Sequence, residues 1–127
     1  DHVIFVGMVP SHEVWKYYQA GDLFVSASTS EIQGMTYAEA LACGLPLLCR
    51  KDECLKEVVA NGENGWQYEN KKEFLEHLAD WFKKSNEEKH DICQNARISA
   101  GQFSAEQFYQ RVVQVYEEKT KKPRGAA

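Results

Sequence analysis

Several signals are missing from this sequence, and each absence argues against a class of function. No apolar run is long enough to cross a bilayer, and no signal peptide opens the chain. The cysteines, which we interpret below as reduced thiols, favour a cytoplasmic protein. Neither a glycine-rich dinucleotide fingerprint nor a phosphate loop ending in Gly-Lys-Ser/Thr is present, which argues against hydride transfer and NTP hydrolysis. The net charge of −4 argues against nucleic acid as a partner, because neutralising phosphates requires a basic face.

Metal-binding patterns are missing too. The sequence has four cysteines but no CxxC pair and no histidine at metal-ligand spacing, so we expect no metal site. We interpret the cysteines as reduced thiols that serve as small core residues; they are Cys43, Cys49, Cys54 and Cys93. The four histidines are scattered along the chain and form no constellation, so we assign them to surfaces.

What the sequence does contain is an alternation of short apolar runs and helical patterns. We predict strands at residues 3–6, 23–25, 45–49 and 66–68 and helices at 35–43 and 54–60, with helices again from 71 onward. Ser11 is expected to cap a further short helix. This alternation predicts one α/β domain with a Rossmann-like, doubly wound parallel sheet and a helical C-terminal end. Residues 119–127 are expected to form a solvated basic tail.

Residues 31–39, EIQGMTYAE, contain two acidic residues, Glu31 and Glu39, eight positions apart. The segment follows a predicted strand, and parallel α/β sheets bind ligands at the carboxyl ends of their strands. If the helix begins near Gly34, the backbone amides of Gly34, Met35 and Thr36 are unpaired donors that can hold a phosphate. Glu39 then lies roughly 6–8 Å beyond this cradle, at about 1.5 Å of rise per residue.

The two carboxylates therefore lie on opposite sides of the bound anion. They cannot share one glycosidic oxygen, so a retaining hydrolase pair at a separation of about 5 Å is disfavoured. Each can instead accept hydrogen bonds from a sugar, Glu31 from a hexose and Glu39 from a ribose. In the alternative interpretation, neither acid binds a ligand: Glu31 is a loop residue near a helix start, and Glu39 is a helix residue that faces solvent. The spacing by itself does not exclude this alternative.

The surrounding sequence resembles one family closely. Residues 20–46, AGDLFVSASTSEIQGMTYAEALACGLP, contain an aspartate-led strand, a serine-rich loop, two glutamates and a final Gly-x-Pro. Residues 55–65, LKEVVANGENG, continue the pattern. Together they resemble the C-terminal, donor-binding domain of retaining GT-B glycosyltransferases, the glycosyl transferases group 1 family (family 4). The resemblance covers roughly residues 3 to 118.

This resemblance implies specific roles for the site residues. Glu31 would be the catalytic residue that contacts the transferred sugar. The backbone around Gln33, Gly34, Met35 and Thr36 would hold the sugar and the distal phosphate, and Glu39 would hold the ribose. The substrate would be a nucleotide-sugar, with no cofactor and no metal.

The resemblance also implies that other parts of such an enzyme lie outside this chain. Those parts are the N-terminal acceptor-binding domain and the first strands of the donor domain, whose Arg and Lys hold the leaving pyrophosphate. Arg50 and Lys51 do not match those family positions. We therefore expect a truncated nucleotide-sugar-binding domain over residues 1–127, inactive alone and able to self-associate through exposed apolar surface and a free strand edge.

Gln33 and Met35 resemble a subgroup that contains bacterial diacylglycerol glucosyltransferases. UDP-glucose and a glycolipid or polysaccharide precursor are the substrates that this implies, with the parent protein peripheral at the inner face of the membrane. Gln33 stands where the wider family has Phe or Tyr, which leaves the donor open. Two alternatives remain: a non-catalytic nucleotide-binding α/β module, and a sugar-nucleotide epimerase, although no histidine falls in the motif loop.

Overall fold

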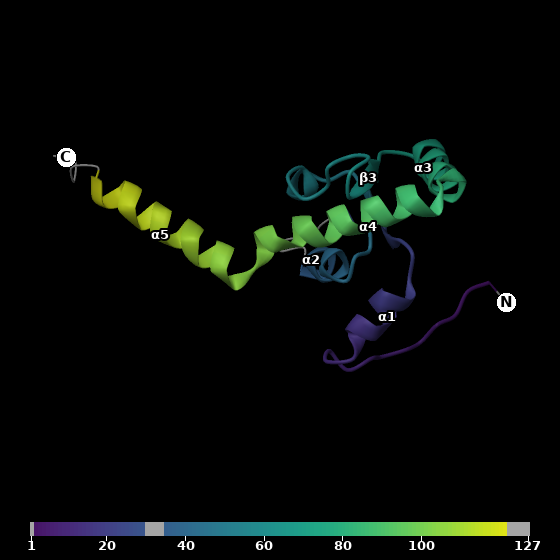
Figure 1. Ribbon diagram of the computed structural model, residues 1–127, viewed down its shortest axis with the longest axis horizontal. Helices are drawn as coiled ribbons and strands as arrows, with labels where there is room; N and C mark the ends of the chain where they lie inside the picture. Colours follow the sequence, from purple (N-terminus) through teal and green to yellow (C-terminus); the bar gives the residue numbers. More distant parts are fainter. Residues whose placement is uncertain (1, 30–34, 122–127) are drawn as a thin grey trace.

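The computed structural model describes residues 2–29 and 35–121 (Figure 1). In chain order the elements, with η for a 3₁₀ helix, are α1 (Val14–Ala20), β1 (Phe24–Ser26), α2 (Met35–Ala42), β2 (Leu47–Arg50), η1 (Glu53–Leu55), β3 (Gly65–Tyr68), α3 (Lys71–Lys83), α4 (Asn86–Ala100), η2 (Gly101–Phe103) and α5 (Ala105–Lys121). The strands form a parallel sheet in the order β1-β2-β3. The predicted α/β class with a helical C-terminal end is confirmed.

The central strand β2 supplies side chains to both faces of the sheet. Leu47 and Cys49 face α2 and are fully buried with Tyr37 and Leu41. Leu48, also fully buried, faces the other way into a second cluster. That cluster comprises Leu48, Trp66, Tyr68, Trp81 and Ile92. Because α2 and α3 pack on opposite faces, every side chain of β2 before Arg50 is removed from water, as expected for a strand of a doubly wound sheet.

Helix α2 ends as the sequence predicts. Gly44 has a φ of 80°, in the left-handed region, and its N–H donates to the carbonyl of Leu41. The N–H of Leu45 donates to the carbonyl of Ala40, which completes a Schellman motif. A Cβ on Gly44 would lie 2.7 Å from Nε of Arg97 in α4, a flexible side chain that can move aside, so the positive φ is what favours glycine here.

The turn before β3 is fixed by a buried amide. The Asn64 side chain is 3% exposed, donates to the carbonyl of Val58 and to Ser99 Oγ, and accepts from the N–H of Ala60. The next residue, Gly65, runs so close to β2 that a Cβ would lie 2.3 Å from the Leu47 carbonyl oxygen. The close contact explains why a glycine opens this strand.

Helices α3 and α4 begin at side-chain caps. Asn70 accepts from the N–H of Glu73, and Ser85 forms a reciprocal capping box with Glu88. The aromatic side chains of α3 differ in burial, because Trp81 is buried whereas Phe82 is 70% exposed. Helix α5 follows α4 through η2 and extends away from the sheet (Figure 1).

Several local predictions are wrong. Residues 3–6 form no strand and are exposed, because no described strand lies beside them to pair with their backbone. Ser11 does not cap α1, which begins after Glu13 without a side-chain cap. The predicted helix at 54–60 is a single 3₁₀ turn, η1, followed by turns, and it leaves Cys54 exposed instead of in the core.

The predicted tail overlaps the last helix, because α5 continues to residue 121, and residues 122–127 lie outside the described part. Among the described residues, we find no helix both long enough and apolar enough to span a bilayer.

Candidate functional site

The candidate site lies where β1 ends and α2 begins. Glu31, Gln33 and Gly34 lie outside the described residues, so the structure describes only part of the predicted set. Met35, Thr36 and Glu39 all lie on α2 and are exposed. Positions three and four apart share one face of a helix, so these three residues form one exposed face of the first turns. The buried face carries Tyr37, Ala40 and Leu41.

Helix α2 sets the distance between its first turn and Glu39. Met35 is the first residue of the helix and Glu39 the fifth, so their backbones are about 6 Å apart along the axis. The N–H groups of a helix's first turn have no partner within the helix and carry the positive end of its dipole. The exposed face of α2 therefore combines backbone donors for an anion with a carboxylate one turn further on.

The Glu39 carboxylate is held by a tyrosine from another helix. The Tyr18 hydroxyl of α1 donates to Glu39 Oε2 at 3.2 Å. The pKa of Tyr18 is raised by burial and by the charge of Glu39, so this hydroxyl stays protonated and remains a donor at neutral pH. The carboxylate retains Oε1 for a further contact.

The backbone that leads out of β1 is anchored by two more tyrosines. The Tyr37 hydroxyl of α2 bonds with Ser26 Oγ at 3.2 Å, and the Tyr68 hydroxyl of β3 donates to the Ser26 carbonyl at 2.9 Å. Ser26 Oγ also accepts from the N–H of Ser28. The start of the loop toward the predicted motif is therefore fixed by side chains from two neighbouring elements.

A cavity of about 470 Å³ opens at the carboxyl ends of the strands on the α3 side of the sheet. Its lining residues are Val25, Ala27, Arg50, Tyr68, Glu69, Asn70, Lys71 and Phe74. Arg50 follows Leu48 by two positions in β2 and so faces α3, whereas Glu39 stands on the α2 side. Arg50 and Glu39 therefore belong to different sides of the sheet.

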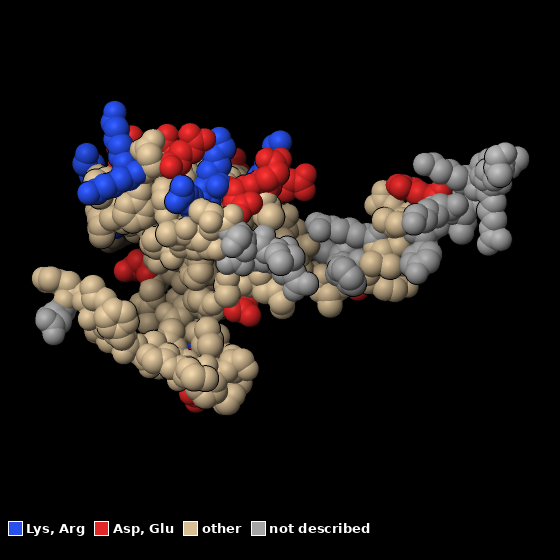
Figure 2. Space-filling view, turned by 180° about the vertical axis from the view of Figure 1, so that it is seen from behind, with Lys and Arg blue, Asp and Glu red and all other residues tan. Residues whose placement is uncertain are grey.

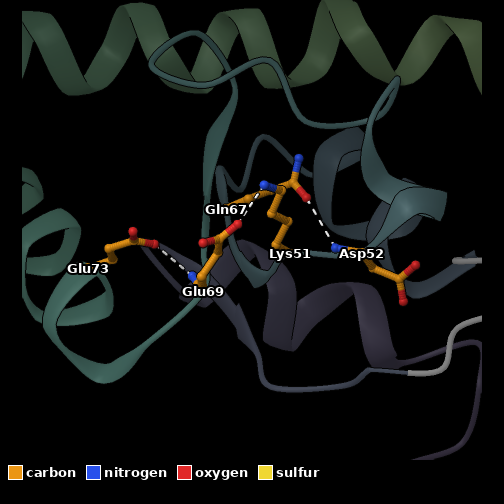
Figure 3. A network of polar contacts seen from close by, with 5 residues as sticks. All are labelled: Lys51, Asp52, Gln67, Glu69 and Glu73. Atoms are coloured by element: carbon orange, nitrogen blue, oxygen red, sulfur yellow. Dashed lines mark hydrogen bonds and ion pairs between the residues drawn. The ribbon is translucent and has the colours of Figure 1, made fainter.

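Lys51 is engaged in a surface network (Figure 3). Its ammonium pairs with Glu69 at 2.5 Å, while the N–H of Glu69 donates to Glu73 and the N–H of Asp52 donates to Gln67. The hydrogen bond with Glu69 raises the pKa of Lys51, and the same bond lowers the pKa of Glu69. Both side chains are more than half exposed, so this pair contributes little stability. It ties the loop after β2 to the loop after β3.

Charged side chains of both signs are interspersed at the end of the molecule that carries α3 (Figure 2). Within residues 2–29 and 35–121, no group of three or more His, Cys, Asp or Glu side chains could hold a metal ion. The four cysteines are free thiols, with Cys49 buried and Cys43 and Cys93 half-buried.

Sequence reasoning missed three residues of this region: Tyr18, Tyr37 and Tyr68. Their hydroxyls reach groups 11 to 42 positions away along the chain, at separations that no local pattern encodes. The sequence indicates only that each tyrosine occurs at or next to a predicted helix or strand that borders the site.

The fold and the candidate site define a class of protein: a parallel α/β domain in which the helix after β1 has an exposed start and carries an exposed carboxylate. Residues 1–99 match the family model of the glycosyl transferases group 1, and the chain belongs to that family.

Three relatives refine this assignment. The chain is 37% identical over 103 residues to the alpha-monoglucosyldiacylglycerol synthase of Acholeplasma laidlawii, covering 81% of this chain and 26% of the relative. It is 44% identical over 68 residues to the enzyme of the same name from Streptococcus pneumoniae, covering 54% and 15%. It is 27% identical over 121 residues to spore coat protein SA of Bacillus subtilis, covering 92% and 32%. The chain thus spans a third or less of the length of each.

Proposed function

We propose that this chain is the donor-binding part of a retaining hexosyltransferase that moves glucose from UDP-glucose to a glycolipid acceptor. The observation that carries the proposal is the exposed face of the first turns of α2. There the backbone donors at Met35 lie about 6 Å along the helix axis from the backbone of Glu39, whose side chain carries the carboxylate. This spacing suits a nucleoside diphosphate, whose phosphates need N–H donors and whose ribose needs an acceptor.

The names of two relatives support the sugar and the acceptor. Both are alpha-monoglucosyldiacylglycerol synthases, so their product carries glucose in α linkage on diacylglycerol. UDP-glucose also carries its glucose in α linkage, and an α-linked product therefore means retention of configuration. A lipid acceptor favours an enzyme that works at a membrane surface, with this chain on the cytoplasmic side.

The proposed reaction breaks the bond between glucose C1 and the diphosphate oxygen and forms a bond between C1 and the oxygen of an acceptor hydroxyl on the same face. The proton of that hydroxyl passes to the leaving diphosphate. The diphosphate leaves with the bonding electron pair, and its charge is stabilised by the N–H groups at Gly34, Met35 and Thr36. Glu31 contacts the hydroxyls of the transferred glucose, with Gln33 beside it. No metal or cofactor takes part, and the acceptor is held by a separate domain.

The test is calorimetric titration of the chain with UDP, UDP-glucose and GDP-mannose. We expect Glu39→Ala to weaken UDP and UDP-glucose equally, by about 1–3 kcal/mol, because the ribose is common to both ligands. Glu57→Ala is the matched control, since Glu57 is another exposed glutamate and lies in a turn after η1. We expect the control variant to bind like the unaltered chain.

Glu31→Gln separates the roles of the two acids. It should weaken UDP-glucose while leaving UDP almost unchanged, because its proposed contact is with the sugar. Equal effects of Glu31→Gln and Glu39→Ala on both ligands would contradict the separate roles. Binding of UDP without any preference for a hexose would favour a non-catalytic nucleotide-binding module instead.

A further inference from the structure

We propose that Tyr18 is a positioning residue for nucleotide recognition: it holds the Glu39 carboxylate in the orientation that accepts the ribose hydroxyls. This inference rests on the proposed function and extends the site to a third element, α1. Its starting observation is the hydrogen bond from the Tyr18 hydroxyl to Glu39 Oε2, which joins residues 21 positions apart.

An exposed glutamate by itself is a poor recognition element. Its side chain has three rotatable bonds, and fixing a long side chain costs conformational entropy. Glu39 is exposed on α2, and Tyr18 is the partner that the structure gives to its carboxylate. Holding Oε2 removes part of this entropy cost before the ligand arrives, while Oε1 remains available as an acceptor.

Tyr18 can serve as a fixed point because its own ring is packed. The ring contacts that of Phe24 in β1 at a centroid distance of 6.0 Å, and Phe24 meets the ring of Tyr37 edge-on at 5.7 Å. Both Tyr18 and Phe24 pack against the buried cluster between α2 and the sheet. A hydroxyl on a packed ring costs little entropy when it forms a hydrogen bond.

The same row of rings reaches the loop after β1. Tyr37 carries a hydroxyl that bonds with Ser26 Oγ, so the row has a polar contact at each end. One contact holds Glu39 and the other holds the start of the loop that leads toward the predicted phosphate cradle. Packing of Tyr18, Phe24 and Tyr37 thus connects the contact to Glu39 with the contact to Ser26.

The test compares UDP with 2′,3′-dideoxy-UDP, which lacks the ribose hydroxyls. For Tyr18→Phe we expect about a three- to tenfold loss of affinity for UDP. Affinity for the dideoxy ligand should change less than about twofold, because it makes no contact with Glu39. A merely structural role of Tyr18 would lower both affinities together, so the ratio of the two affinities is the decisive readout.

The matched control is Tyr17→Phe, which removes the same hydroxyl from the neighbouring position. Tyr17 is about half exposed, and its hydroxyl has no hydrogen bond to any residue that the structure describes. We expect this variant to leave both affinities unchanged. An equal loss in Tyr17→Phe and Tyr18→Phe would overturn the inference.

The remaining outcomes distinguish the two proposals. If Glu39→Ala lowers the ratio of UDP to dideoxy-UDP affinity and Tyr18→Phe does not, the positioning role is wrong and the ribose site stands. If the unaltered chain binds neither ligand, or if Glu39→Ala leaves the ratio unchanged, the proposed role of Glu39 fails and the role of Tyr18 fails with it.

Discussion

Residues 3–6 and residues 47–49 of strand β2 are both apolar stretches, but they differ completely in structure. In residues 3–6 the four side chains are between 55% and 93% exposed, whereas Leu47, Leu48 and Cys49 of β2 are fully buried. Strand β2 has a parallel neighbour on each side and a helix on each face. Residues 3–6 have none of these among the described residues. They belong to an arm formed by residues 2–12, which contain no Lys, Arg, Asp or Glu (Figure 2).

This difference shows that an apolar run forms a buried strand only where neighbouring strands pair with its backbone and helices cover its side chains. A strand buried on both faces requires two covering layers and paired backbone groups, which β2 obtains from β1, β3, α2 and α3. The residues that cover β2 should therefore be sensitive to substitution, and those of the arm should not.

The largest expected effect is at the contact between β2 and β3. Gly65→Ala places a Cβ 2.3 Å from the Leu47 carbonyl oxygen and 2.8 Å from its nitrogen, so the backbones must separate. We expect a loss of more than about 3 kcal/mol in the free energy of unfolding, measured by urea denaturation. Gly101→Ala is the control, because a Cβ there meets no atom within 4 Å. Similar losses in both variants would show that the close approach of the strands is unimportant.

A smaller effect is expected from truncating one side chain in each apolar stretch. Leu48→Ala removes a fully buried side chain and should destabilise the chain by about 2–5 kcal/mol. Ile4→Ala, at a position 83% exposed, should change stability by less than about 0.5 kcal/mol. Urea denaturation of both variants measures the contrast directly. A loss at Ile4 comparable to that at Leu48 would mean that the arm is packed in solution, and the comparison would break down.

The smallest effect concerns a thiol of β2. Burial raises the pKa of Cys49 from 9.0 to about 12, so the folded state holds this proton more tightly than the unfolded state does. The associated stability is complete below about pH 9 and is lost as the pH rises toward about 12. At pH 8, iodoacetamide should therefore modify the exposed Cys54 in the folded chain and spare Cys49 until urea is added. Mass spectrometry reads out the order, and early modification of Cys49 would contradict its burial.

The parts of the fold that the sequence predicts correctly are those with local causes. Gly44 followed by Pro46 marks the end of α2, the turn residues at 61–65 precede β3, and apolar residues at helical spacing mark α3 and α5. The errors fall where distant contacts decide. Residues 3–6 needed a neighbouring strand, and residues 54–60 are shaped by the turn around Asn64, whose amide bonds to Ser99 of α4.

The candidate site also has features with local causes and features that depend on distant contacts. The start of α2 and the exposure of its Glu39 face follow from a local pattern of small and polar residues. The contact of Glu39 with Tyr18, and that of Ser26 with Tyr68, depend on how α1 and β3 pack beside the site. No spacing within residues 31–39 could indicate these partners.

The most direct test of the central claim is to locate the nucleotide by NMR, recording amide shifts of the chain as UDP-glucose is added. The diphosphate has two alternative positions in the structure. One is the start of α2, and the other is the start of α3, beside the cavity lined by Arg50, Asn70 and Lys71. We predict the largest shift changes at Met35, Thr36 and Glu39, with smaller ones at Tyr18. Changes centred instead on Arg50, Asn70 and Lys71, with α2 unaffected, would contradict the account.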